Sequence, residues 1–183
     1  TSETYGTAQY IPIDEKHPMV GQSPYSASKI SADQLAVSYY KSFDLPVAIA
    51  RPFNTYGPRQ PARAIIPTII IQILNDQNKI KLGNLTPTRD FNYVKDTVKG
   101  FLAIAESDKT IGEITNICSN SEIYMKKTVN TIIKLIGKEV EILQNEERVR
   151  SDKCEVGRLY GYVSKIKSLT SCKLRYNLKD LLS

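Results

Sequence analysis

The chain has 183 residues, 41% of them hydrophobic and 24% charged, which excludes a disordered protein and suits one globular core, alone or with an incomplete second. Its 25 basic and 19 acidic residues give a net charge of +6, which suits an anionic partner, but the basic residues are scattered without a recognition motif, so we expect no nucleic-acid partner. Three widely separated cysteines and one histidine argue against a disulfide framework and against a zinc site, and we expect no metal.

The first predicted element is a long helix over residues 25–43, preceded by a Ser-Pro start at 23–24. Its apolar residues recur at helical spacing and predict one buried stripe. The members of this stripe are Ala32, Leu35, Ala36, Tyr39 and Phe43. The short apolar run 47–50 then indicates a strand buried on both faces of a parallel sheet, ending at residues 51–52.

A second helix is predicted from about residue 63 to residue 75, because isoleucines recur there at four-residue intervals, although isoleucine also suits strands. The apolar run 64–74 within it is too short to cross a bilayer. No signal peptide is visible, so we expect a cytoplasmic protein without a membrane partner. Short strands are expected at 79–82 and 89–93.

Asp96 is placed to cap a third helix. The residues that this helix is expected to bury are Val98, Phe101, Leu102 and Ala105. A strand at 114–117 precedes a fourth helix through 129–136, which Gly137 ends. The polar chain after about residue 144 has no clear pattern. Strands that alternate with helices indicate an α/β protein.

Two residues of the first helix are candidates for chemistry. Tyr25 and Lys29 are four positions apart, which puts both on one helix face within reach of a common ligand. A free tyrosine has a pKa near ~10 and is a poor base at neutral pH, but a nearby ammonium group favours the phenolate. Alone, the pair also fits an exposed helical pair without function, because the chain has 11 tyrosines.

Two further motifs flank this pair: Thr-Ser-Glu-Thr-Tyr-Gly at 1–6 and Arg-Pro-Phe-Asn-Thr-Tyr-Gly-Pro-Arg at 51–59. In this order the three motifs resemble the extended short-chain dehydrogenase/reductase family, whose NAD-dependent members act on nucleotide sugars as epimerases and dehydratases. The nearest resemblance is to GDP-mannose and to UDP- or GDP-N-acetylglucosamine 4,6-dehydratases. It extends from Thr1 to about Arg150 and covers the second half of a typical member.

This resemblance implies an α/β fold, the second half of a Rossmann-type doubly wound parallel sheet plus a small α/β substrate-binding domain. Residues 1–58 would belong to the NAD-binding domain and 59–183 mainly to the substrate-binding domain, with 89–106 returning to the sheet. The chain begins inside a motif and has no glycine-rich turn for the cofactor pyrophosphate. We therefore expect a fragment that is inactive alone, from a parent enzyme that is a homodimer.

The resemblance also implies catalytic roles. Thr1 would hydrogen-bond the sugar hydroxyl, Tyr25 would remove its proton as hydride passes from C4 to NAD, and Lys29 would support the tyrosinate and contact the nicotinamide ribose. The expected NAD contacts are Tyr25, Lys29 and Pro52.

The residues after Thr1 determine the reaction that the oxidised sugar undergoes. A 4-keto sugar has an acidified C5 hydrogen, which the carboxylate of Glu3 could remove. Ser2 stands where one dehydratase subclass has an aspartate that protonates the departing C6 oxygen. We therefore predict a 4,6-dehydratase, a lyase. A 4-epimerase, a UDP-glucuronate decarboxylase, which shares the Thr-Ser-Glu triplet, and a non-catalytic remnant stay open as alternatives.

Substrate binding should involve guanidinium groups, which bind diphosphate oxygens bidentately. Arg89 is the best candidate, followed by Arg150 and Arg63. Gly83 lies in a segment that resembles the phosphate site of the family, and Asn54 is expected to touch substrate or nicotinamide. The other polar positions receive no such role: His17 is expected at the surface, and Ser164 is placed to cap a last helix.

Overall fold

The structure is an α/β protein whose strands pair mostly in parallel. The computed structural model describes residues 1–75, 78–145 and 155–176. The parallel pairs in these ranges are β1 (Ile49–Pro52) with β6 (Ile114–Ile117), β2 (Asn54–Tyr56) with β5 (Phe91–Tyr93), and β3 (Lys79–Leu82) with β8 (Glu141–Gln144). The antiparallel pair is β4 (Thr88–Arg89) with β7 (Ile123–Tyr124). The parallel pairing confirms the predicted fold class.

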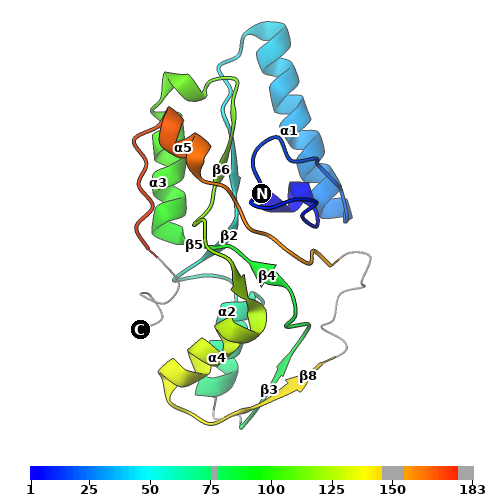
Figure 1. The fold of residues 1–183 in the computed structure, drawn as a ribbon, viewed down its shortest axis with the longest axis vertical. Coiled ribbons are helices and arrows are strands. Elements are labelled where there is room, and N and C mark those ends of the chain that lie inside the picture. The colour runs from blue at the N-terminus through cyan, green and yellow to red at the C-terminus, as the bar shows by residue number, and fades with distance from the viewer. Residues whose placement is uncertain (76–77, 146–154, 177–183) are drawn as a thin grey trace.

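The helices gather in two groups along the length of the molecule. They are α1 (Pro24–Phe43), α2 (Ile65–Leu74), α3 (Val94–Ala105), α4 (Met125–Ile136) and α5 (Ser164–Leu169), with short 3-10 helices η1 (Ser2–Tyr5) and η2 (Asp108–Thr110). Helices α1 and α3 lie on either side of β6, whereas α2 and α4 lie beside β3 and β8 (Figure 1). No helix in the described ranges combines the length and the apolar character needed to span a bilayer.

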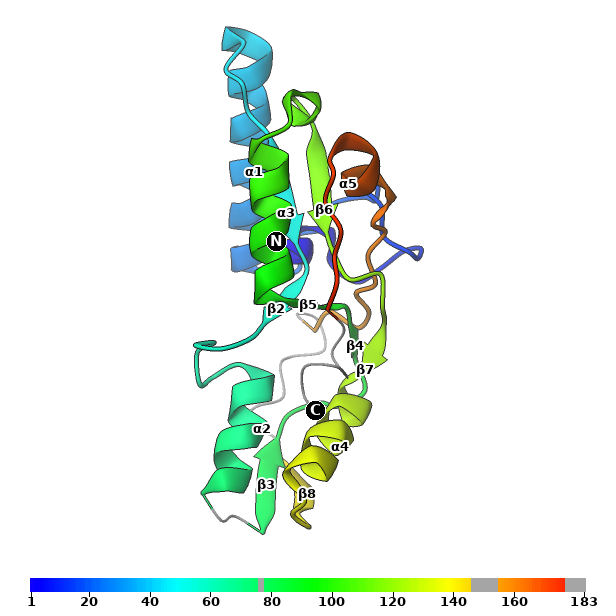
Figure 2. The same cartoon turned by 90° about the vertical axis from the view of Figure 1, so that its left-hand side faces the viewer.

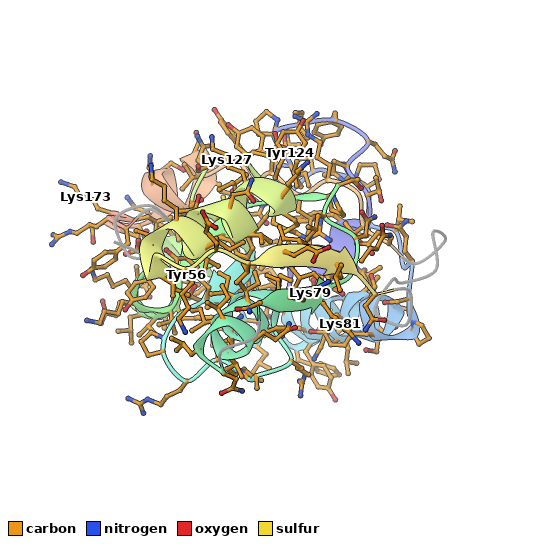
Figure 3. All side chains as sticks on the ribbon, turned by 90° about the horizontal axis from the view of Figure 1, so that it is seen from below. Tyr56, Lys79, Lys81, Tyr124, Lys127 and Lys173 are labelled. Atoms are coloured by element: carbon orange, nitrogen blue, oxygen red, sulfur yellow. The ribbon has the colours of Figure 1, made fainter. Side chains whose placement is uncertain are left out.

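Each group of helices has its own hydrophobic cluster. The first cluster centres on Tyr5, Ile13, Phe53, Ile117, Leu159 and Ile166 and also buries Cys118 and Cys172. The second centres on Ile69, Ile73, Ile80, Leu82, Val129 and Ile132. On β3, buried Ile80 and Leu82 alternate with Lys79 and Lys81, which point outward (Figure 3). This alternation is that of a strand with one face packed on the core.

The predicted ends of two helices are confirmed by their caps. Ser23 Oγ accepts a hydrogen bond from the N–H of Ser26 (3.1 Å) and Pro24 opens α1, as a Ser-Pro start predicts. Gly137 ends α4 with φ at 74°, a left-handed conformation that glycine adopts at little cost.

The predicted buried faces of α1 and α3 are wrong. On α1, Leu35 and Phe43 are 60% and 73% exposed, and the side that turns inward carries Ser26, Ile30 and Asp33. The remaining members of its predicted stripe are Ala32, which is exposed, Tyr39, which is 47% exposed, and Ala36, which is half-buried. The two-stranded β1–β6 pair can cover only one side of such a helix.

On α3, the exposed residues are Val98, Phe101, Leu102 and Ala105, all four of the predicted core positions. The buried face instead carries Thr97, Gly100 and Ile104. A Cβ at Gly100 would lie 2.8 Å from Ile117 Cγ2, so α3 packs on β6 through its smallest residue. Close approach of the backbone, rather than apolar area, selects this face.

Smaller corrections concern strands and caps. The strand expected at 89–93 is divided at Asp90 into β4 and β5, and the strand expected at 47–50 begins at Ile49. Asp96 lies in the first turn of α3 rather than at its cap, and Ser164 is the first residue of α5, with Val163 rather than Ser164 at the cap position. His17 is not at the surface: it is buried, and its ring lies edge-on to Tyr5.

Residues 155–162, which had no predicted structure, join two distant parts of the chain. The N–H of Leu159 donates to the carbonyl of Thr88 in β4 (3.2 Å). On the other side, the N–H of Ile13 donates to the carbonyl of Tyr160 (2.7 Å). Farther along the chain, residues 171–176 run alongside α3 (Figure 2). There, Asp96 Oδ2 accepts a hydrogen bond from the N–H of Tyr176 (2.9 Å). The end of the described chain is thus tied to both the amino-terminal loop and the α3 helix.

Two glycines of this joining segment should respond differently to an added methyl group. A Cβ at Gly161 would lie 2.6 Å from Cys118 Cβ and 2.8 Å from Phe53 Cζ, whereas a Cβ at Gly157 would meet only Thr7 Cγ2 at 3.7 Å. We expect Gly161→Ala to lower the free energy of unfolding by about 1–3 kcal/mol through overpacking. Gly157→Ala should change it by less than about 0.5 kcal/mol. Urea unfolding of both variants tests this, and equal losses would contradict the described packing.

Candidate active site

The amino-terminal motif forms the 3-10 helix η1, with Thr1 as its cap. Thr1 Oγ1 accepts a hydrogen bond from the N–H of Glu3 (3.3 Å), and Thr4 Oγ1 donates to the carbonyl of Thr1 (2.9 Å). Ser2 and Tyr5 are buried, whereas Thr1 and Glu3 are half-buried. The turn therefore leaves Thr1 and Glu3 partly accessible, while Ser2, predicted to be catalytic, points away from solvent.

Helix α1 brings the predicted Tyr25 and Lys29 pair beside η1. Both side chains are exposed, with the Lys29 ammonium 5.6 Å from the centroid of the Tyr25 ring. The adjacent Ser26 donates from its Oγ to the carbonyl of Glu3 (2.6 Å). The structure thus gathers residues from the first two motifs in one region.

Beneath this region lies a buried polar network. Arg51 of β1 is 1% exposed, and its Nε donates to Asp33 Oδ2 of α1 at 2.8 Å. Its guanidinium carbon lies 4.9 Å from the centroid of the Tyr5 ring, and its Nη2 contacts Met19 Sδ at 3.0 Å. Tyr5 donates from its hydroxyl to Asn116 Oδ1 (2.7 Å). Burial raises the pKa of Tyr5 to about 12, so this tyrosine is a structural donor rather than a base.

The third motif supplies residues near the ends of the strands. Pro52 ends β1, and Asn54 opens β2. The Oδ1 atom of Asn54 is buried and has no hydrogen-bond partner among the described residues. A buried acceptor without a partner is costly and often marks a functional position.

The predicted substrate residues are spread over a wider area. Arg89, 14% exposed, donates to the carbonyl of Thr88 (2.8 Å) and forms an ion pair with Glu155 at 3.2 Å. Gly83 follows β3, and Arg63 is exposed just before α2. No bond among the described residues connects Arg63 with Arg89. Arg150 lies outside the described residues.

Asp90, beside Arg89, was not anticipated. Its carboxylate is fully buried and accepts hydrogen bonds from the N–H and Oγ of Ser119 (2.8 and 2.6 Å) and from the N–H of Gly161 (3.2 Å). Burial raises the pKa of Asp90 to about 6, against the opposing effect of the Ser119 bonds. Asp90 thereby joins the end of β4 to the loop after β6 and to the 155–162 segment. Three of the four residues in the segment 88–91 are polar, so no hydrophobic pattern singles out Asp90 in the sequence.

Asp33 and Arg51 were also not anticipated as a pair. Asp33 follows Lys29 at the same four-residue interval that separates Lys29 from Tyr25. This repetition was the signal in the sequence, but the separation of 18 positions between Asp33 and Arg51 gives no indication of their contact.

A cavity of about 360 Å³ lies where the chain leaves β2 for α2. Tyr56 and Tyr93 contribute aromatic walls, with ring centroids 5.6 Å apart, and Ile66 and Ile70 of α2 contribute an apolar side. None of the predicted site residues lines it.

The comparisons with known proteins point to enzymes that act on nucleotide sugars. Residues 1–183 match the family described as GDP-mannose 4,6 dehydratase. Human dTDP-D-glucose 4,6-dehydratase is 34% identical over 136 residues, which cover 74% of this chain and 39% of the human protein. The structure of dTDP-glucose 4,6-dehydratase from Bacillus anthracis in complex with NAD superposes with a TM-score of 0.88 at 30% identity, covering 100% of this chain and 57% of that chain.

A second solved structure is equally similar. UDP-glucuronic acid 4-epimerase from Bacillus cereus, in complex with UDP-glucuronic acid and NAD, has a TM-score of 0.89 and 30% identity, and this chain covers 57% of it. The chain therefore spans about two fifths to three fifths of the length of these relatives. The fold is common to a dehydratase and an epimerase, so it does not by itself separate the two reactions.

The buried Asp90 carboxylate should make stability depend on pH. Its pKa rises from 3.8 to about 6 on folding, so its stabilising effect is fully present below pH 3.8 and is lost as the pH rises through about 6. At about 1.4 kcal/mol per pKa unit, the loss is on the order of 3 kcal/mol. We expect the unfolding free energy of wild type, minus that of Asp90→Asn, to fall by this order between about pH 4 and about pH 7.

Urea unfolding of both proteins at a series of pH values gives this difference, in which other titrating groups cancel. A difference that rises with pH would show that the bonds from Ser119 and Gly161 outweigh burial.

Proposed function

Because the chain belongs to the GDP-mannose 4,6 dehydratase family, within the short-chain dehydrogenase/reductase epimerases and dehydratases of nucleotide sugars, we propose that the whole protein is an NAD-dependent nucleotide-sugar 4,6-dehydratase. One observation carries this proposal: the carboxylate of Glu3 lies on the same short helix as Thr1, against the helix that presents Tyr25 and Lys29. Oxidation of a sugar carbon and removal of the neighbouring proton could then occur in one place.

NAD is proposed as the cofactor, since both similar structures are described as complexes with NAD. The donors on α1 suit its nicotinamide ribose, because the exposed ammonium of Lys29 and hydroxyl of Tyr25 lie on one helix face. Pro52, at the end of β1, would border the nicotinamide. When bound, NAD would accept a hydride from sugar C4 and return it at C6.

The residues of the chain would manage the protons. Tyr25, as phenolate, would take the proton of the C4 hydroxyl, with Thr1 hydrogen-bonded to the same oxygen and the Lys29 ammonium stabilising the phenolate. Glu3 would then take the proton from C5. We propose that Glu3 passes this proton to the departing C6 hydroxyl, with Ser2 beside it on η1, and that the hydroxyl leaves as water. As hydride returns at C6, C5 would take up a proton from solvent through Glu3, and Tyr25 would release its proton to solvent, so that the net change is the loss of one water.

The nucleotide would be held by residues of β2 and β4 and of the segments that follow β3 and precede α2. Arg89 is the proposed diphosphate ligand, with its guanidinium held in place by Thr88 and Glu155. Gly83 and Asn54 are proposed to complete the site, with Arg63 and Arg150 as further candidates. We also propose that 59–183 form mainly a substrate-binding domain, with 1–58 and 89–106 in the NAD-binding domain.

We further propose that the whole protein is a cytoplasmic homodimer that associates through α1. The outer side of this helix exposes Leu35, Tyr39 and Phe43, which is more apolar surface than a solvated helix face usually carries.

A direct test is to incubate the protein from its complete reading frame with UDP- and GDP-N-acetylglucosamine, GDP-mannose and dTDP-glucose. We expect a 4-keto-6-deoxy product, lighter than its substrate by one water, detectable by mass spectrometry and NMR. No such product from any of these sugars would refute the dehydratase proposal.

Replacing Glu3 by glutamine should separate dehydration from oxidation. Because glutamine cannot accept the C5 proton, we expect Glu3→Gln to slow formation of the 4-keto-6-deoxy product by about 10²–10⁴-fold. Incorporation of solvent deuterium at C5 should fall with it. Glu106→Gln, which changes an exposed carboxylate beyond α3, is the matched control and should retain wild-type rates.

A 4-epimerase is the second candidate, because the Bacillus cereus epimerase superposes as well as the dehydratase does. The same substitution decides between them. An epimerase needs no base at C5, so an epimer of unchanged mass, formed equally fast by Glu3→Gln, would replace the dehydratase proposal.

A further inference from the structure

We propose that Asp33 is a positioning residue: through Arg51 it holds the catalytic side of α1 against η1. The effect of Asp33 on catalysis rests on the proposed function, but its effect on how α1 is attached to η1 can be tested separately.

Helix α1 is attached to the rest of the chain by few apolar contacts. It is 20 residues long, yet Ser26 is its one buried residue in the described structure. The inward side chains of Ile30 and Val37 are only half-buried. Among the described residues, hydrophobic packing on α1 is sparse, and hydrophobic packing is not directional. The directional polar contacts of α1 with η1 and β1 therefore contribute to setting how far the helix turns about its axis.

Two such contacts stand on either side of Lys29. Three residues before it, Ser26 donates to the carbonyl of Glu3 (2.6 Å), and four residues after it, Asp33 accepts from Arg51 Nε (2.8 Å). Residues separated by three or four positions lie on neighbouring points of one helix side. Lys29 is thus located between two fixed points, and Tyr25 directly precedes the first of them.

Both contacts lead to the same short helix. Ser26 binds η1 directly at Glu3. Asp33 reaches η1 through Arg51, whose guanidinium lies 4.9 Å from the centroid of the Tyr5 ring. Because η1 also carries Thr1, the two contacts together relate Tyr25 and Lys29 to Thr1 and Glu3, the residues that must act on adjacent sugar carbons.

The Arg51 contact is the more rigid of the two. Its side chain is 1% exposed and that of Asp33 is 16% exposed, so water cannot readily replace the carboxylate. A buried guanidinium deprived of its counter-ion is strongly unfavourable. Misplacement of reacting groups by about 1 Å can cost on the order of 10²-fold in rate. A small rotation of α1 should therefore reduce catalysis well before it unfolds the protein.

The test uses Asp33→Asn, which keeps an acceptor for Arg51 and removes the charge, and Asp33→Glu, which keeps the charge. Ser26→Ala removes the other contact with little change in volume and serves if Asp33→Asn does not fold. The control is Glu141→Gln, which removes the exposed ion pair with Lys79 (2.9 Å) far from α1.

The first measurement is hydrogen–deuterium exchange of the chain, which requires no substrate. We expect Asp33→Asn to speed exchange of α1 amides by about 10-fold or more, with α4 unchanged and Glu141→Gln like wild type. Unchanged exchange in α1 would refute the proposal that Asp33 and Arg51 hold this helix in place, whatever reaction the protein catalyses. If no nucleotide sugar reacts with wild type, the proposed function fails. The exchange rates of α1 still decide whether Asp33 and Arg51 hold this helix in place.

The second measurement is steady-state kinetics of the complete protein. We expect Asp33→Asn to lower kcat about 10–100-fold, with KM for the nucleotide sugar within about 2-fold, and Asp33→Glu to recover most of kcat. If α1 exchanges faster but kcat is that of wild type, Asp33 has a structural role only and the positioning proposal is wrong.

Discussion

The arrangement of this molecule depends on one buried guanidinium. Arg51 is almost completely removed from water, and a charge in that position persists only with a counter-ion and further polar or aromatic contacts. Asp33, Tyr5 and Met19 provide them from α1, η1 and the loop between these helices. Three segments that are separate in the sequence thereby contact one strand. The candidate catalytic side chains lie on these segments. Their relative positions therefore depend on the contacts that the Arg51 guanidinium makes with Asp33, Tyr5 and Met19.

A second buried charge does similar work at the substrate side. Asp90 connects the end of β4 to the loop after β6 and to the 155–162 segment, while Arg89 beside it is paired with Glu155 of the same segment. Residues 155–162 also pair with the loop that follows η1. The predicted sugar-oxidising residues and the predicted diphosphate ligand are therefore linked through a few consecutive backbone bonds. This linkage is a reason for the segment to be ordered without belonging to a regular sheet.

Much of this fold and site follows from local sequence, and the remainder does not for definite reasons. The limits of β3 are set by alternation and the end of α4 is set by Gly137, and both are local signals. The buried side of α3 is not local, because Gly100 is chosen by the close approach of Ile117. Similarly, the spacing of Tyr25 and Lys29 predicts a shared helix side, but only the fold shows that Arg51 reaches Asp33 and that Ser2 is turned inward.

Two hydroxyl groups, one from η1 and one from α1, should converge on a single sugar carbon. The most direct measurement is a crystal structure of the complete protein with NAD and a nucleotide sugar. Thr1 Oγ1 and Tyr25 Oη should both lie within about 3 Å of the oxygen on sugar C4, with the carboxylate of Glu3 near C5. A complex in which these hydroxyls face separate solvent regions, or in which the sugar binds away from α1, would contradict this convergence.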